Sequence, residues 1–439
     1  MHSRDIYQAL LSVTSSWRKR KPLRYVNLEE YKSRIWLNPK KSFPEELQRM
    51  AQKPLNHVRA RFNDKVISEQ VGASLFWSAL RKTMQDNTLL NKMANRQVLP
   101  DDDTKASDIF LKTLYASIEQ VPVVYESVTP DGKKVMLSGK IFLPPKKRVK
   151  SIIVANHFTI CSNREAPSHA NCIEGILATK EYIVIMPDYV GYGVTANLPH
   201  PYLQLESAVT SSIDLLKAAI PYLRARLYVF PKPIILVGYS QGAAVTMAMQ
   251  KKLEEEYADR FPVKQTYIGA GPYDLATTYD FYVSQPVTAI PCSLPMLIIG
   301  MSYGEHLDLK REDYFQPEMM ENCPKLIDSK LLTLFEVNEL LDHDIHKLLT
   351  PLIFSKDTYP TTLLYEAMKK NSIIDWTPKA PLYMFHSTED DMVPFINSIK
   401  AANSFASQFL TNIEYEFAPY GHHILAAVTF FEKVYHRLK

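Results

Sequence analysis

Ser240 stands at the centre of a Gly-x-Ser-x-Gly segment, Gly238-Tyr239-Ser240-Gln241-Gly242. An apolar run at 233–237 precedes it, and an Ala- and Met-rich stretch follows it. A sharp turn from a buried strand into a helix exposes a serine hydroxyl, and glycines flank the turn because side chains there would clash. The pattern predicts that Ser240 is a nucleophile. It also predicts that the backbone N–H of Gln241, at the helix start, stabilises a developing oxyanion.

A serine is a weak nucleophile unless a histidine takes its proton and a carboxylate orients that histidine. The loop 386–394 follows an apolar strand-like run and carries several carboxylates, of which we assign Asp390 as the acid. Asp391 and Glu389 on the same loop are competitors, and Asp274, which follows an earlier strand, is a further alternative.

The base is predicted to be His423, in the turn Gly421-His422-His423 that leads into the last helix. His422 is the alternative. The remaining histidines of the later chain are expected to be packing or cap residues, and they are His343, His346 and His386.

The second oxyanion donor is expected in the loop 156–160, which follows the third predicted strand. A backbone N–H of Phe158 or Thr159 is the candidate, with His157 shaping the loop.

The elements that must position these groups are strands and alternating helices. Residues 121–128 and 135–144 around a Pro-Asp-Gly turn predict an antiparallel hairpin. The later runs are apolar on both faces, as in the middle of a parallel sheet that is covered by helices. These later strands are predicted at 151–156, 182–187, 233–237, 266–270, 381–385 and 413–417. Helices are predicted at 202–225, 242–257, 394–410 and 423–438.

This order predicts an α/β fold with a mostly parallel central sheet and flanking helices. Residues 118–439 would form the catalytic domain, with residues 275–375 inserted between the sixth and seventh strands as a helical cap. Residues 1–117 read as a mainly helical, polar N-terminal extension, and no chemistry can be inferred from it.

Composition narrows the class of protein further. The hydrophobic content of 46% and charged content of 22% are those of a globular protein, and the net charge of +4 gives no reason to invoke nucleic acid. No apolar run is long enough for a transmembrane segment, and no secretory signal peptide is visible at the start.

The four cysteines fall in two close pairs along the chain, a spacing that permits two disulfides or four thiols; they are Cys161, Cys172, Cys292 and Cys323. None has Cys-x-x-Cys spacing, and no metal site is predicted.

Taken together, these segments resemble the α/β-hydrolase superfamily, and more narrowly the secretory lipase and prolyl-oligopeptidase-like esterase branch. The resemblance is carried by 187–193, 200–202, 238–242, 269–275, the Asp390 loop and 421–423, and it covers 118–439. It implies hydrolysis of a small-molecule or lipid carboxylic ester by a Ser-Asp-His triad, through an acyl-enzyme and without a cofactor. It also implies a cap that shapes the acyl pocket, contact with a lipid interface, and export if the sequence is trimmed; an untrimmed chain would be cytoplasmic. The oligomeric state does not follow from it.

Two other functions remain open at this point. A serine peptidase of the prolyl-oligopeptidase type would use the same triad, although no propeller repeat accompanies it here. A hydrolase-fold binding protein without activity would keep the fold and leave Ser240 unreactive.

Overall fold

The computed structural model describes residues 26–27, 118–170, 172–285, 287–355, 362–408 and 410–439. Within them a single sheet has the strand order β1-β2-β3-β5-β4-β6-β7-β8-β9. β2 pairs antiparallel with β3, and β3 with β5, whereas the strands from β5 to β9 pair in parallel. The strands are β1 (Val26–Asn27), β2 (Glu119–Val128), β3 (Lys134–Leu143), β4 (Ile152–Asn156), β5 (Ile183–Pro187), β6 (Ile234–Tyr239), β7 (Val263–Gly269), β8 (Leu382–Ser387) and β9 (Ile413–Ala418).

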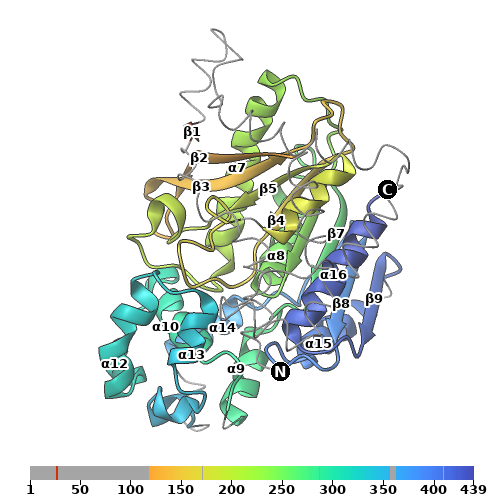
Figure 1. Ribbon diagram of the computed structural model, residues 1–439. Coiled ribbons are helices and arrows are strands. Elements are labelled where there is room, and N and C mark those ends of the chain that lie inside the picture. Colours follow the sequence, from red (N-terminus) through yellow and green to blue (C-terminus); the bar gives the residue numbers. More distant parts are fainter. Residues whose placement is uncertain (1–25, 28–117, 171, 286, 356–361, 409) are drawn as a thin grey trace, which may run out of the picture.

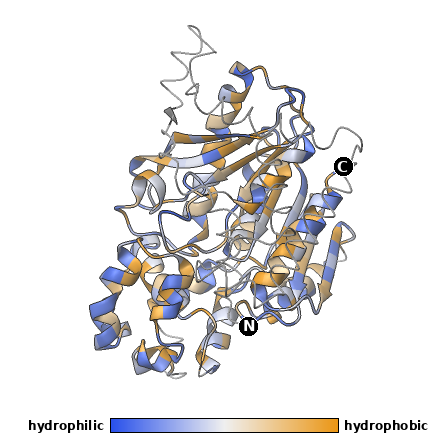
Figure 2. Cartoon of the chain, in the orientation of Figure 1, coloured by the Kyte–Doolittle hydropathy of each residue, from blue (hydrophilic) through white to orange (hydrophobic). Residues whose placement is uncertain are grey.

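Helices cover both faces of this sheet (Figure 1). One apolar core packs α7 (Leu205–Ala225), α8 (Gln241–Glu256) and α15 (Ile396–Ala406) on one face. A second core packs η1 (Ile173–Lys180) and α16 (His423–Arg437) on the other. β4, β5 and β6 are buried along their whole length, as their unbroken apolar runs predict for strands covered on both sides. Figure 2 shows these hydrophobic strands at the centre of the molecule.

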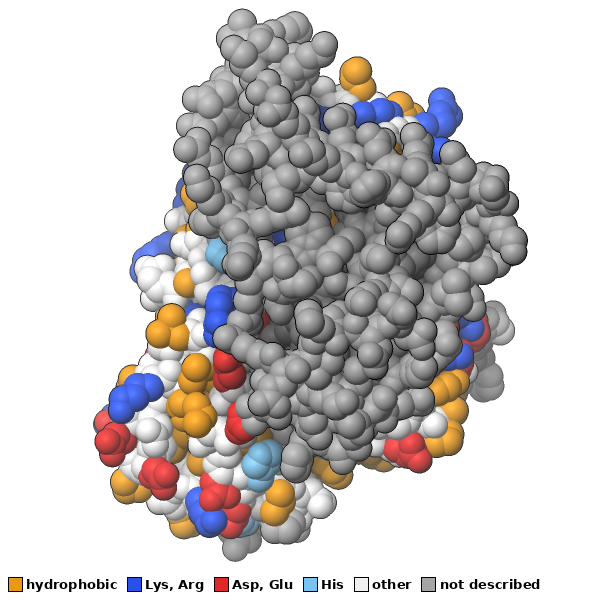
Figure 3. Space-filling view, viewed as in Figure 1, with side chains coloured by type: hydrophobic (Ala, Val, Ile, Leu, Met, Phe, Trp, Pro, Cys, Tyr) orange, Lys and Arg blue, Asp and Glu red, His pale blue; other side chains and the backbone are white. Residues whose placement is uncertain are grey.

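The chain between β7 and β8 is helical and has a core of its own, in which Leu294, Phe335 and Leu364 are buried. Figure 1 shows its helices, mostly in cyan, grouped at one end of the molecule. On the side of this segment seen in Figure 3, acidic, basic and hydrophobic side chains of the described residues are interspersed, and they form no patch of one charge. Its elements are α9 (Leu275–Ser284), α10 (Ser293–Gly304), α11 (Arg311–Tyr314), α12 (Pro317–Cys323), η3 (Pro324–Asp328), α13 (Leu334–Leu340), η4 (Ile345–Lys347), η5 (Pro351–Ile353) and α14 (Leu363–Lys370).

The fold class is therefore confirmed: a mostly parallel sheet, flanked by helices, with a helical insertion after the sixth predicted strand. The short η2 (Gly193–Thr195) completes the described elements. The predicted N-terminal extension, 1–117, lies outside the described residues except for β1.

No disulfide joins Cys161, Cys292 or Cys323 to another cysteine among the described residues. One member of each sequence pair approaches the other, because Cys161 Sγ lies 3.8 Å from Cys292 Sγ, at the start of α10.

Gly242 should be intolerant of any side chain. A Cβ added there would lie 2.0 Å from Asn156 O and 2.8 Å from His157 O, both backbone atoms that cannot move aside cheaply. We expect Gly242→Ala to lower the melting temperature strongly or to prevent soluble expression, as thermal unfolding would measure. The control is Gly132→Ala, where no atom lies within 4 Å and only the positive φ of 77° is penalised. That variant should lose about 1 kcal/mol. Equal stability of the two variants would contradict the steric explanation.

Candidate active site

Ser240 occupies the turn between β6 and α8 with φ 58° and ψ −128°, a backbone conformation that L-residues rarely adopt. The turn is held by a hydrogen bond from Ser240 N to Gly269 O (2.8 Å). Both flanking glycines lie against backbone, since a Cβ on Gly238 would come within 2.1 Å of Gly242 O. The predicted strand–serine–helix turn is therefore present, with a strained backbone at the serine.

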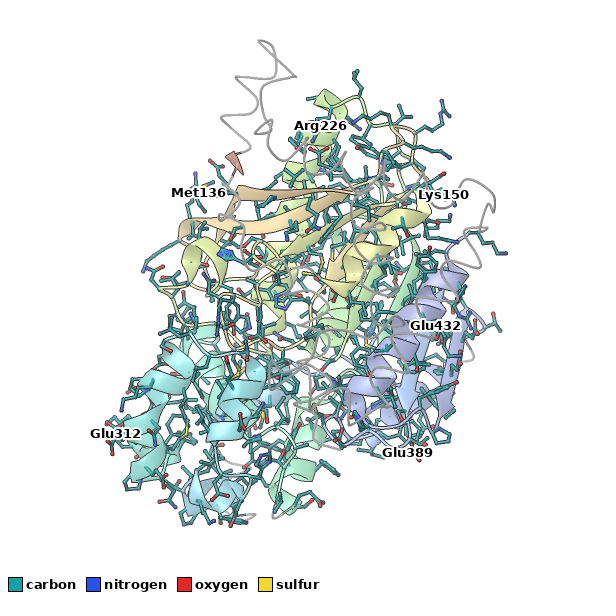
Figure 4. The ribbon with its side chains drawn as sticks, in the orientation of Figure 1. Met136, Lys150, Arg226, Glu312, Glu389 and Glu432 are labelled. Atoms are coloured by element: carbon teal, nitrogen blue, oxygen red, sulfur yellow. The ribbon has the colours of Figure 1, made fainter. Side chains whose placement is uncertain are left out.

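Asp390 and His423 come together from two neighbouring loops. Asp390 lies in the loop after β8, and His423 is the first residue of α16, after β9. His423 Nδ1 lies 2.6 Å from Asp390 Oδ2, and the two side chains are 5% and 0% exposed. Glu389, by contrast, is exposed at the outer edge of this loop (Figure 4).

The Asp390 carboxylate is held on both oxygens. Its Oδ1 accepts the backbone N–H groups of Met392 (2.9 Å) and Val393 (2.7 Å), and its Oδ2 faces His423. Burial by itself would raise the pKa of Asp390, but the neighbouring His423 and His386 outweigh it and hold that pKa well below its usual range. The carboxylate is therefore ionised, as the orienting member of a triad must be.

The alternatives lie nearby but in other roles. Asp391 Oδ1 accepts the backbone N–H of His423 (3.0 Å), so this carboxylate fixes the start of α16 rather than the imidazole. Both ring nitrogens of His422 are buried and find no hydrogen-bond partner among the described residues. Asp274 is the N-cap of α9, and its carboxylate accepts hydrogen bonds from Thr277 and Lys400.

Ser240 and His423 line the same cavity, although no hydrogen bond joins them among the described residues. Tyr239 helps to set the position of His423, because its hydroxyl donates to His423 O (2.8 Å) and its ring centroid lies 4.9 Å from the imidazole. In enzymes without bound substrate, catalytic hydrogen bonds are often long and tighten only in the reacting complex.

The predicted oxyanion groups border this cavity as well. Gln241 is the first residue of α8, where the backbone N–H has no partner within the helix. Phe158 and Thr159 line the cavity wall next to it. Their loop begins at Asn156, which is tied to α8 by a hydrogen bond from its Nδ2 to Thr246 Oγ1 (2.9 Å).

The cavity is almost entirely apolar. It encloses about 920 Å³ of empty space, including its open mouth. No Asp, Glu, Lys or Arg belongs to the wall formed by the described residues. The inserted segment supplies much of this wall, and its lining residues include Leu275, Tyr279, Ile290, Leu294, Leu297, Leu334 and Phe335.

Three supporting residues were missed at the sequence level. His386, interpreted as a packing residue, lies beside Asp390, with Nε2 3.3 Å from Asp390 Oδ2. His200 Nε2 lies 3.3 Å from the side-chain Nε2 of Gln241, and burial lowers the pKa of His200 to about 3, so the ring is neutral. Glu165 accepts the backbone N–H of Leu334, which ties the loop after β4 to α13. Only His386 had a usable signal, since it stands four residues before Asp390 at the end of a strand.

The fold, with a strained serine after β6, a carboxylate after β8 and a histidine after β9, defines an α/β-hydrolase. The chain belongs to the secretory lipase family, whose model matches residues 170–431, more than half of its length. The prediction of a carboxylic ester hydrolase is confirmed at this level. No curated protein matches the chain.

Solved structures with the same fold include the rice cell wall degrading esterase LipA from Xanthomonas oryzae. It is 20% identical, with a TM-score of 0.66 over 74% of this chain and 94% of that one. A protein from Legionella pneumophila is 24% identical, with a TM-score of 0.66, and the match covers 73% of this chain and 88% of that one. Lipase A from Candida antarctica is 16% identical, with a TM-score of 0.56, and the match covers 70% of this chain and 73% of that one. At these identities the likeness shows the fold.

Among the described residues, no helix is long and apolar enough to cross a membrane.

Stability should depend on pH through Asp390. Its pKa lies below the value of about 3.9 that it takes in the unfolded chain. The ionised carboxylate therefore stabilises the fold above that pH, and the contribution is lost as the pH falls toward the folded-state pKa. We expect Asp390→Asn to lower the free energy of unfolding by about 1–3 kcal/mol at pH 7 and by less at pH 3, as urea denaturation would measure.

The control for this measurement is Glu255→Gln, which removes an exposed carboxylate from α8. Its effect should be small at both pH values. An Asp390→Asn effect that stays constant or grows toward pH 3 would contradict the low pKa.

Proposed function

We propose that this protein is a serine esterase or lipase that works through an acyl-enzyme. Ser240 Oγ attacks the ester carbonyl and His423 accepts its proton. The same imidazole then protonates the departing alcohol, while Asp390 orients the ring and stabilises its positive charge. In the second half of the cycle, a water molecule gives a proton to His423 and attacks the acyl carbonyl, and Ser240 Oγ then departs with that proton as the acid is released.

The observation that supports this proposal best is the buried 2.6 Å contact between His423 and Asp390 beside the cavity that Ser240 enters. Asp390 accepts at Nδ1, which directs Nε2, the other ring nitrogen, to exchange protons with Ser240. The backbone N–H of Gln241, together with that of Phe158 or Thr159, would receive the negative charge on the carbonyl oxygen.

The cavity supports an apolar acyl group as the part of the substrate that enters. Its wall carries mostly aliphatic and aromatic side chains. A peptidase that fixes a peptide terminus needs a charged partner, which the wall formed by the described residues does not offer. This favours ester hydrolysis over the prolyl-oligopeptidase-type reaction.

We infer that residues 275–375 act as a cap on the catalytic domain 118–439. The cap carries Leu334 and Phe335 over the acyl pocket, and Glu165 connects it to the loop that holds the oxyanion candidates. Export of the enzyme and work at a lipid–water interface fit membership of a secretory lipase family.

Activity should depend on Ser240 and Asp390 and not on Asp391 and His422, the sequence neighbours of the proposed acid and base. Ser240→Ala should lower kcat on a p-nitrophenyl ester by on the order of 10⁶, and Asp390→Asn by on the order of 10⁴, with the fold intact by circular dichroism. Asp391→Asn and His422→Gln are the matched controls and should change kcat by only a few-fold. Full activity of Ser240→Ala would exclude the mechanism, and a larger loss in Asp391→Asn than in Asp390→Asn would reassign the acid.

The length of the acyl pocket should depend on Phe335. Phe335→Leu enlarges the cavity, so kcat/KM for a long-chain ester relative to a short-chain one should rise about tenfold. Phe315→Leu is the control, because Phe315 is equally buried in the same core but does not line the cavity. An equal change in both variants, measured on a series of p-nitrophenyl esters, would show that the effect is not local to the pocket.

A further inference from the structure

His386 contributes an imidazole to the same carboxylate that holds His423. It stands in β8, is fully buried, and packs edge-on against Phe395 with 5.5 Å between ring centroids. Its Nε2 lies 3.3 Å from Asp390 Oδ2 and 3.2 Å from Val393 O. Its Nδ1 lies 2.7 Å from Ser398 Oγ, in α15.

These contacts fix where the ring carries its proton. Asp390 Oδ2 and Val393 O can only accept, so Nε2 must carry hydrogen and share it between the two oxygens. In the neutral ring Nδ1 is then an acceptor, and Ser398 is the hydroxyl that donates to it. Ser398 thus selects the tautomer of His386 that can donate to Asp390.

The other polar groups around Asp390 are engaged elsewhere. Tyr239 from β6 donates to His423 O, and Tyr282 from α9 donates to Met392 O. Asp391 accepts from His423 N and adds negative charge nearby. Among the described residues, the two imidazoles are the groups that face Asp390 Oδ2, His423 Nδ1 at 2.6 Å and His386 Nε2 at 3.3 Å.

We propose that His386 is a positioning residue for the triad, and that it acts with Ser398 to hold Asp390 Oδ2 in the plane where it meets His423. The two backbone N–H groups fix Oδ1, but one fixed oxygen leaves the carboxylate free to pivot. A second donor on Oδ2 removes that freedom and leaves the carboxylate aligned for the short hydrogen bond to His423.

This inference rests on the proposed function, since it assigns a helper to the proposed acid. It is tested with two variants that fill a similar volume and differ in the donor. His386→Gln keeps an N–H near the position of Nε2, and His386→Met removes it. We expect His386→Met to lower kcat about tenfold with KM within twofold, and His386→Gln to restore most of the loss.

A second readout does not need activity. The proton between His423 Nδ1 and Asp390 Oδ2 should give a far-downfield ¹H NMR signal, identified by its loss in Asp390→Asn. His386→Met should shift or broaden that signal, and His386→Gln should leave it near the wild-type position. If the wild type hydrolyses no ester, the proposed function fails, and this signal still decides whether His386 positions Asp390.

Thermal unfolding shows whether each variant still folds. Unchanged kcat and an unchanged signal in His386→Met would overturn the inference. So would equal losses of kcat in the Met and Gln variants. If His386→Met does not fold, Ser398→Ala takes its place, because it keeps the imidazole and removes the hydroxyl that selects its tautomer. A wild-type kcat and signal in that variant would overturn the inference as well.

Discussion

The close approach of two backbones beside Ser240 is the constraint on which the rest of the site depends. Gly242, at the start of α8, lies against the carbonyl groups of Asn156 and His157, at the end of β4. This contact brings the first N–H groups of α8 next to the loop that carries Phe158 and Thr159. The turn that strains Ser240 thus also builds the wall on which an oxyanion would rest, so the proposed nucleophile and the proposed oxyanion donors cannot be positioned independently.

The sheet positions the proposed acid and the proposed base. β8 and β9 pair in parallel up to Ser387 and Ala418, so the two loops that follow leave the same edge side by side. Additional bonds tie these loops together, including those from Thr388 N to Ala418 O and from Ser387 Oγ to Gly421 O. A parallel strand pair therefore converts a long sequence separation into a buried 2.6 Å contact between His423 and Asp390.

Much of this arrangement could be predicted from sequence, because the strands are short apolar runs and the loops after them carry the chemistry. The turn at Ser240 and the loops of Asp390 and His423 follow from strand order alone. What could not be predicted depends on contacts between distant segments. The approach of Cys161 to Cys292 and the tie from Glu165 to Leu334 join the catalytic core to the inserted segment, and neither pair has a periodic signal. The place of His386, four residues before Asp390, was a signal for their contact, but a buried histidine at a strand end looks the same in sequence whether it only packs or also donates.

The central claim is that Ser240 is the activated nucleophile of this site. The most direct measurement is mass spectrometry of the protein after reaction with a fluorophosphonate, with the modified residue located by peptide sequencing. The account predicts one phosphonyl group on Ser240, formed rapidly by the wild type and far more slowly by His423→Gln. An unmodified Ser240, or labelling at the same rate without His423, would contradict it.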